Sequence, residues 1–226
     1  MISLVKKSIE PEGFILYTDH QDRGRGQRGN AWLDEPGKNI LMSVLLRPTF
    51  VNPSQQYLLN LIAGLAVIDG MKKHLKDEDF SLKWPNDIYL NEKKVGGILI
   101  ESNLKGSKLE YSIVGLGLNV NQSGFNLRTA TSLLLESRTQ CDRLELMEDV
   151  VSHLEKWYLK LKNGGEPLIQ SAYLDRLMWK DELRIFEVDG QEKEGTIKGI
   201  DKYGKLKVEI DRTVQLFNIK EIRFLR

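Results

Sequence analysis

The sequence has one cysteine and no long hydrophobic segment. A single cysteine, Cys141, excludes an intrachain disulfide and is typical of a protein kept in a reducing compartment. The longest largely apolar run, from Tyr57 to Ile68, falls short of the roughly 20 residues that a membrane-spanning helix needs. The first residues lack the apolar stretch of a secretion signal. Together these absences predict a soluble cytoplasmic protein.

An excess of charge of either sign is also missing. The 33 basic residues balance 32 acidic ones, so the formal net charge is +1. This balance argues against a broad positive surface for nucleic acid or membranes, and any anion site must therefore be local. The three histidines, His20, His74 and His153, are scattered along the chain and predict no metal-ligand cluster.

The spacing of hydrophobic residues predicts a larger region of strands and helices, followed by a small β-rich region. Apolar runs bounded by turn residues predict strands, whereas apolar residues three or four positions apart predict helices. In the larger region we expect strands at 14–18, 39–47, 81–84, 87–90, 96–102 and 109–120, and helices at 53–74 and 143–162. In the smaller region we expect strands at 183–188, 194–200, 205–210, 214–219 and 222–225. The predicted fold class is α/β in the broad sense (α+β), with domains at 1–178 and 179–226.

Local signals mark where the two long helices begin. Asn52 and Pro53 precede Gln55 at the capping-box position, and Asp142 precedes Glu145 in the same way. Along the second helix we expect a buried stripe made of Leu144, Met147, Val151, Leu154, Tyr158 and Leu161.

The stretch QDRGRGQRGNAW, residues 21–32, mixes glycines with arginine and amide side chains. Gly24, Gly26 and Gly29 permit backbone conformations in which N–H groups converge on an anion, while Arg25 and Arg28 supply forked donors. The composition therefore predicts a clamp for phosphate or carboxylate. Two other interpretations stay open: an exposed loop that is basic for solubility, and an RGG-like contact with nucleic acid.

A second stretch, KWPNDIYLNEKKVGGILIE at 83–101, predicts a strand, a turn and a hairpin. The hairpin can bring the carboxylate of Asp87 and the ammonium of Lys94 to the same end of a sheet. A surface hairpin with solvated lysines is the alternative. Gly96 and Gly97 favour a ligand site, because glycine within a strand often marks the close approach of a ligand or another backbone.

A third stretch, VGLGLNVNQ at 114–122, thins a predicted strand with Gly115 and Gly117. Strand alternation places Asn119 and Asn121 on one face and their apolar neighbours on the other. The pattern lacks the third glycine of a dinucleotide fingerprint, and the chain has no phosphate-binding G-x-x-x-x-G-K-[ST] motif, so both of those nucleotide-binding folds are excluded.

In order and spacing, GRGQRGNAW, KWPNDIYLNEKKVGGILIE, VGLGLNVN and the C-terminal GIDKYGKLKVEI resemble the motifs of biotin protein ligases, over nearly the whole chain. The resemblance implies a catalytic domain like that of class II aminoacyl-tRNA synthetases, a mixed sheet flanked by helices, and then a small SH3-like β-barrel. It implies biotin and ATP with Mg²⁺ as reactants. The implied partner is the biotin carboxyl carrier protein of an acyl-CoA carboxylase, with no role for nucleic acid or membrane, and the chain would be a monomer or homodimer.

The resemblance also implies roles for individual residues. Lys94 would contact the biotin carboxylate and the α-phosphate, with Arg25 as the second catalytic residue, and Gln21 would help recognise the polar ring of biotin. The remaining implied biotin contacts are Gly24, Gly97, Leu99, Gly117 and Leu118. The implied nucleotide contacts are Arg25, Gln27, Arg28, Trp32, Asn86, Asp87, Asn119 and Asn121. Asp87 either keeps Lys94 charged or supports the metal, whose ligands stay unassigned.

Three features depart from the family pattern. A Ser/Thr-Thr-Asn segment, which usually precedes the first loop, is missing. We expect a start codon assigned too late, with a truncated chain or a weak ligase as alternatives. Gln27 and Asn30 stand where many relatives carry arginine, so we expect a looser hold on the adenylate. No helix-turn-helix domain precedes the loop, so no repressor role is expected. Competing functions are a lipoate or octanoate ligase and a non-catalytic protein that binds biotin or its adenylate.

Overall fold

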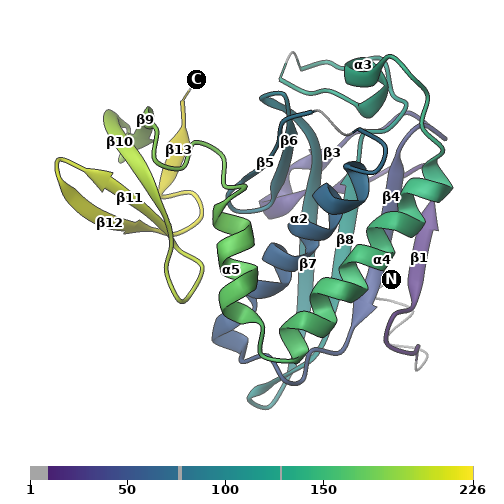
Figure 1. Ribbon diagram of the computed structural model, residues 1–226, viewed down its shortest axis with the longest axis horizontal. Helices are drawn as coiled ribbons and strands as arrows, with labels where there is room; N and C mark the ends of the chain where they lie inside the picture. Colours follow the sequence, from purple (N-terminus) through teal and green to yellow (C-terminus); the bar gives the residue numbers. More distant parts are fainter. Residues whose placement is uncertain (1–9, 76–77, 128, 226) are drawn as a thin grey trace.

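The computed structural model describes residues 10–75, 78–127 and 129–225. The long helices pack against a six-stranded sheet, and a five-stranded sheet lies beside it (Figure 1). The order of the larger sheet is β1-β4-β8-β7-β6-β5. Its strands are β1 (Ile15–Thr18), β4 (Ile40–Leu46), β5 (Phe80–Lys83), β6 (Asp87–Leu90), β7 (Lys93–Lys105) and β8 (Lys108–Leu118). All neighbouring pairs of these strands are antiparallel, and the predicted α+β fold with a large sheet is confirmed.

Helices α2 (Tyr57–Met71) and α4 (Arg143–Lys162) cover one face of this sheet (Figure 1). The face is apolar because alternate residues of each strand point toward the helices. For example, a Cβ at Gly64 of α2 would lie 2.9 Å from Leu82 of β5 and 3.7 Å from Ile98 of β7. The opposite face is left for other elements, and the candidate site lies there. Two shorter helices, α3 (Leu133–Ser137) and α5 (Glu166–Leu174), complete the set.

The predicted start of α2 needs a correction. Asn52 does act as a cap, since its side chain accepts a hydrogen bond from the Ser54 N–H at 3.0 Å, but it caps a short 3₁₀ turn at Pro53–Gln55. Gln55 does not complete a capping box, because its amide donates to Glu166 at 3.2 Å instead. The α-helix therefore begins at Tyr57, and it is buried almost all round.

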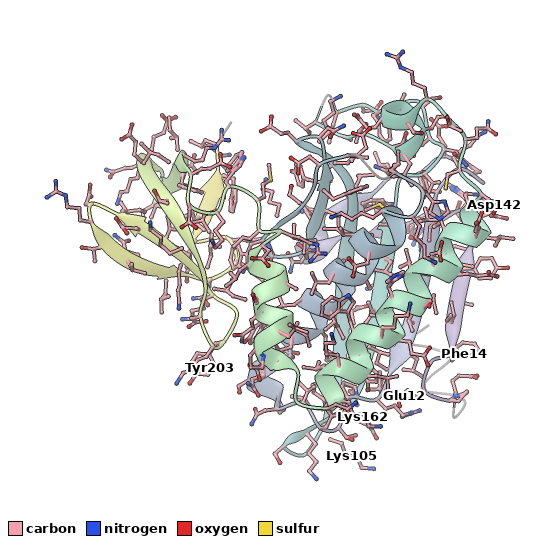
Figure 2. The ribbon with its side chains drawn as sticks, viewed as in Figure 1. Glu12, Phe14, Lys105, Asp142, Lys162 and Tyr203 are labelled. Carbon is pink, nitrogen blue, oxygen red and sulfur yellow. The ribbon has the colours of Figure 1, made fainter. Side chains whose placement is uncertain are left out.

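The predicted bounds and N-cap of α4 are confirmed, whereas part of its buried stripe is wrong. Figure 2 labels Asp142 and Lys162 at the two ends of this helix. The Asp142 carboxylate accepts hydrogen bonds from the N–H groups of Leu144 at 2.8 Å and Glu145 at 3.2 Å. Leu144 is 55% exposed, because contact with α2 turns another stripe inward. That stripe consists of Leu146, Val150, Leu154, Tyr158 and Leu161.

Replacing Asp142 with alanine is expected to lower the free energy of unfolding by about 1 kcal/mol, because two helix N–H groups lose their acceptor. For a chain of this size the melting temperature should fall by about 2 to 4 °C. Asp142→Asn is the matched control, since an asparagine oxygen can still cap the helix. Equal melting temperatures for the alanine variant and the wild type would contradict the assigned cap.

No helix within the described ranges combines the length and apolar character needed to cross a membrane.

The C-terminal sheet supplies the five short strands predicted for the SH3-like module. Its order is β12-β11-β10-β9-β13, with strands β9 (Leu183–Val188), β10 (Gln191–Ile200), β11 (Leu206–Ile210), β12 (Thr213–Phe217) and β13 (Ile222–Phe224). The module packs closely against the larger sheet, because the Trp84 indole N–H donates to the Gly204 carbonyl at 2.9 Å. At Gly204, where φ is +81°, a Cβ would lie 2.6 Å from Tyr57. The turn that carries Gly204 is therefore held directly against the segment between β5 and β6.

Candidate active site

A cleft of about 600 Å³ lies on the face of the large sheet that the long helices leave open. Its walls are the glycine-rich segment 21–32, the turn between β5 and β6, and the edge of the C-terminal sheet. Three segments far apart in the sequence thus meet over one surface, two of which the sequence had marked as candidate ligand loops.

Glycines form the floor of this cleft. In the register of the sheet, Gly117 of β8 pairs with both Leu41 of β4 and Gly97 of β7, and Gly115 pairs with Leu99. Directly paired residues share a face of the sheet, so these glycines remove side chains from one continuous patch. The indole of Trp32 lies over it, since a Cβ at Gly117 would come within 2.7 Å of that ring. The floor is therefore a flat, largely apolar surface beneath an aromatic side chain.

An ion pair stands at one end of the floor. The Lys94 Nζ lies 2.6 Å from the Asp87 Oδ1, with side chains that are 34% and 26% exposed. A bulge explains why Lys94 faces the cleft. Asp87 pairs with Gly97, but Tyr89 pairs with Lys94, so β7 holds one extra residue in this interval, Val95. That extra residue returns Lys94 to the same face as Gly97, as bulges beside functional sites often do.

The backbone at Lys94 is held on its other side as well. Its N–H donates to the Thr129 carbonyl at 2.8 Å, and its carbonyl accepts from the Thr131 N–H at 2.9 Å. The ammonium therefore projects from a fixed backbone toward the cleft, where it supplies a positive charge beside an apolar floor.

The glycine-rich segment forms a small hairpin, with β2 (Gly24–Arg25) paired to β3 (Ala31–Trp32) around a 3₁₀ turn at Gln27–Gly29. Glycine is needed at Gly24 because a Cβ there would lie 2.4 Å from the Trp32 carbonyl oxygen. Only Gly29 among the three predicted glycines has a positive φ, +87°. Moreover, the Gly26 N–H already donates to the Asn30 carbonyl. The predicted nest of free N–H groups is therefore reduced, and the arginine side chains become the main cationic groups of this segment.

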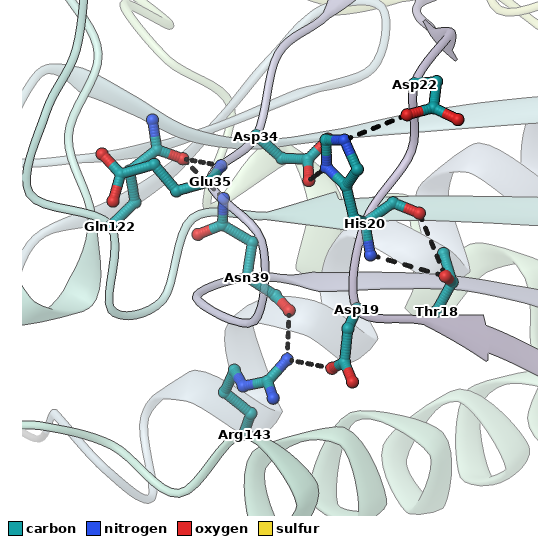
Figure 3. A network of polar contacts seen from close by, with 9 residues as sticks. All are labelled: Thr18, Asp19, His20, Asp22, Asp34, Glu35, Asn39, Gln122 and Arg143. Carbon is teal, nitrogen blue, oxygen red and sulfur yellow. Dashed lines mark hydrogen bonds and ion pairs between the residues drawn. The ribbon is translucent and has the colours of Figure 1, made fainter.

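A polar network fixes the base of this hairpin (Figure 3). His20 contacts Asp34 at 2.9 Å through Nδ1 and Asp22 at 3.3 Å through Nε2, so it joins residues on both sides of the hairpin. The hydrogen bond to Asp34 raises the pKa of His20. Below the hairpin, Arg143 at the start of α4 donates to Asp19 at 2.9 Å. Both ends of the segment are thus tied down, whereas its tip reaches over the cleft.

The structure brings together ten of the residues predicted for the site. These lining residues are Gln21, Arg25, Gln27, Trp32, Asn86, Asp87, Lys94, Gly97, Leu99 and Gly117. Asn86 is fixed there, because its amide donates to the Ile98 carbonyl at 2.5 Å. Gly24 shapes the hairpin without lining the cleft, and the side chain of Arg28 lies outside the described part of the chain.

Three predicted contacts are not brought into the cleft. Leu118 is fully buried on the opposite face, against the helices, because it alternates with Gly117. Asn119 follows the end of β8 and donates to the Thr131 carbonyl at 3.0 Å. Asn121 exchanges two hydrogen bonds with the backbone of Cys141, at 2.8 and 3.0 Å. Both asparagines hold loops in place, and neither they nor Leu118 lines the cleft.

Some residues that line the cleft carried no prediction. Leu41 and Ser43 of β4 face it, and strand alternation next to the buried Met42 could have indicated them. Glu101 at the far end of the β7 floor also lines it. The C-terminal module contributes Lys220 from the turn before β13, together with the sheet residues Glu187, Ile222, Arg223 and Phe224. No local pattern in the sequence signals that the second module would reach this surface.

Comparison with known proteins places this cleft in context. Residues 3–119, more than half of the chain, match the Biotin/lipoate A/B protein ligase family. The chain belongs to this family. Among curated relatives, the biotin–[acetyl-CoA-carboxylase] ligase of Paracoccus denitrificans is 31% identical over 82% of this chain and 80% of its own length.

Two other comparisons extend the likeness within the biotin/lipoate ligase family. The bifunctional ligase/repressor BirA of Bacillus spizizenii is 33% identical over 75% of this chain, which spans only about half (51%) of that relative. The biotin protein ligase of Aquifex aeolicus, solved in complex with biotin and ATP, superposes with a TM-score of 0.82 at 28% identity. That superposition covers 98% of this chain and 93% of the Aquifex chain, so it includes the C-terminal sheet. The predicted resemblance to biotin protein ligases is thereby confirmed.

Proposed function

We propose that this protein activates biotin with ATP to form biotinyl-5′-AMP and then transfers biotin to a lysine of a biotin carboxyl carrier protein. One observation carries the proposal: the Lys94 ammonium stands at the end of a glycine-floored cleft beneath an arginine-bearing hairpin. Binding of biotin and ATP by the Aquifex relative, in a fold that matches this chain throughout, supports the same choice of reactants.

In the first step, an oxygen of the biotin carboxylate attacks the α-phosphorus of ATP, and the bond to the β-phosphate breaks to release pyrophosphate. Two anions must meet, so the reaction needs a fixed positive charge between them. Lys94 is the residue that we assign to this task, because its ammonium is held at the cleft by backbone contacts on both sides. Such preorganised donors act on the charge that develops in the transition state.

In the second step, the ε-amine of the carrier lysine attacks the acyl carbon of biotinyl-AMP. The acyl–oxygen bond breaks, AMP leaves, and the amine loses a proton. Before that attack the mixed anhydride must be kept from water. Arg25, Gln27 and Trp32 of the hairpin line the cleft and would cover the adenylate. Leu99 and the glycine floor would contact the apolar part of biotin, with Gln21 near its polar ring.

Mg²⁺ would enter with the phosphates of ATP, as it commonly does in nucleotide-using enzymes. Of the two roles considered for Asp87, we propose support of Lys94. The separation of 2.6 Å between the carboxylate and the ammonium suits a direct ion pair, which would hold the ammonium in place at the cleft. We assign no metal ligand to the described residues.

We further propose the biotin carboxyl carrier domain of an acyl-CoA carboxylase as the acceptor, and the cytoplasm as the location. We also retain 1–178 as the catalytic domain and 179–226 as the C-terminal domain, with a monomer or homodimer as the assembly. The name of the Paracoccus relative supports the choice of acceptor.

The deciding experiment is ATP–pyrophosphate exchange measured with biotin, with lipoate or octanoate in its place, and without any acid. We expect exchange with biotin alone. Exchange with lipoate or octanoate would assign the chain to the other branch of its family. Binding of biotin without any exchange would identify a non-catalytic binding protein.

Gln27 offers a test of how tightly the hairpin holds the adenylate. Its side chain lines the cleft, so Gln27→Arg should add a cationic donor over the phosphate. We expect release of biotinyl-AMP to slow by about two- to fivefold, the range for a partly exposed charged contact. Rapid filtration of labelled adenylate would measure it. Gln140→Arg, which adds the same charge at an exposed site outside the cleft, should leave the release rate unchanged. Equal release rates for Gln27→Arg and the wild type would refute the assigned role.

A further inference from the structure

One ion pair joins the tip of the glycine-rich hairpin to the floor strand. The Arg25 Nη2 lies 3.3 Å from the Glu101 Oε2. Glu101 belongs to β7, on the same face as Gly97 and Leu99, and at the other end of the floor from Lys94. The carboxylate thus stands inside a cleft whose proposed ligands are anions. A lone carboxylate there would repel them, so its pairing with a cation needs an explanation.

The remaining polar contacts of the hairpin are local. Gly26 and Asn30 bond to each other and within the turn, and His20 braces the base through Asp22 and Asp34. Among the described side chains of residues 21–32, Arg25 makes the one polar contact with the six-stranded sheet. The other link is apolar, the packing of Trp32 over Gly117. The arginine half of the tip is therefore held down by Glu101.

We propose that Glu101 is a positioning residue that docks the Gly24–Gly29 hairpin tip onto the sheet through Arg25. The contact uses a single guanidinium nitrogen. A guanidinium has five N–H donors, so Arg25 can keep Glu101 on one side and still offer donors to a phosphate on the other. Glu101 fixes where those donors point. The aiming of the Arg25 donors at a phosphate rests on the proposed adenylation, whereas the docking of the hairpin by Glu101 does not.

The docking can be tested in the ligand-free protein by limited digestion with trypsin. The hairpin carries cleavable arginines, and cleavage follows the fraction of time that the tip is detached. Side chains that are 68% and 36% exposed form a weak pair, so Glu101→Gln should raise the initial cleavage rate by about two- to fivefold. Glu110→Gln, on the same β7–β8 hairpin but outside the cleft, should leave the rate unchanged.

Charge reversal provides the decisive comparison. Arg25→Glu places two carboxylates together, so cleavage after Arg23 and Arg28 should be fast. Adding Glu101→Arg restores a pair of opposite charges. The hairpin sequence that trypsin cleaves is the same in Arg25→Glu and in this double variant. We expect the double variant to be cleaved about as slowly as the wild type. Equal rates for Arg25→Glu and the double variant, or an unchanged rate for Glu101→Gln, would overturn the proposal.

The same variants separate docking from catalysis. In the double variant the hairpin should be protected while ATP–pyrophosphate exchange stays impaired, because the guanidinium at position 25 has moved from the hairpin to the floor strand. If Glu101 only stabilised the fold, its replacement would lower the melting temperature, and adding Glu101→Arg to Arg25→Glu would not slow cleavage of the hairpin. If the wild type lacks exchange altogether, the proposed function fails, and the digestion result still decides the role of Glu101.

Discussion

Replacing Lys94 with alanine is expected to lower biotin-dependent ATP–pyrophosphate exchange by about 10²- to 10³-fold, the usual cost of losing one preorganised donor to a developing charge. The reason lies in the geometry of the bulge. It holds the Lys94 ammonium in the cleft beside Asp87, whereas the ammonium of the neighbouring cleft residue Lys83 lies over the rings of Tyr89 and Phe224. Exchange measured at saturating ATP and biotin reports this step directly.

Lys93→Ala is the matched control for that loss. Lys93 is the neighbouring residue, but its side chain is 48% exposed and pairs with Glu136 at 3.3 Å, outside the cleft. We expect exchange close to the wild-type rate in this variant. Both variants should melt near the wild-type temperature, because neither side chain is buried. Near-normal exchange by Lys94→Ala, with the fold intact, would remove the central residue from the proposed mechanism.

Filling the glycine floor is expected to produce the second large effect. A Cβ at Gly97 would meet only ordinary contacts, 3.5 Å from Trp32 and 3.7 Å from Asp87 and Lys94. Gly97→Ala should therefore fold normally, and its melting temperature should be equal or slightly higher, since alanine restricts the unfolded chain. The added methyl group would occupy space that the proposed ligand needs. Overpacking of this kind costs about 1 to 3 kcal/mol, so we expect the biotin dissociation constant to rise by about 10- to 100-fold.

Gly117→Ala provides an informative contrast with Gly97→Ala. A Cβ at Gly117 would lie 2.7 Å from the Trp32 ring, so the indole must move even without ligand. Calorimetric titration with biotin, combined with melting curves, would separate the two cases. Unchanged biotin affinity in Gly97→Ala would show that the ligand does not lie on this floor.

Much of the fold could be predicted because its signals are local. The Asp142 cap and the bounds of α4 follow from short-range hydrogen bonds that the sequence displays. The buried stripe of α4 depends on its tertiary contact with α2, which the sequence of α4 alone does not specify. The prediction that Leu144 is buried was wrong for that reason. Likewise, the Gln55 amide donates a hydrogen bond to Glu166, a residue distant in sequence, and does not form the expected cap.

The candidate site shows the same division between local and tertiary information. The motifs identified Lys94, Gly97 and the hairpin, because their residue types are unusual for a strand or helix. Asn119 and Asn121, which the resemblance implied as nucleotide contacts, lie outside the cleft, because amide side chains serve loop carbonyls as readily as ligands. The wall contributed by the C-terminal sheet depends on how two modules pack, and a short motif carries no information about that.

The bulge at Val95 makes the number of residues between Lys94 and Gly97 as important as their identities. A substitution between Lys94 and Gly97 changes the volume or polarity of one side chain and leaves the direction of the others unchanged. Without the bulge, regular alternation would place Lys94, three residues before Gly97, on the opposite face of the sheet, in the hydrocarbon packing around Leu118 and Ile88. The direction of the ammonium therefore depends on the irregular pairing at Val95, and the outer turn at Asn91 and Glu92 has no part in it.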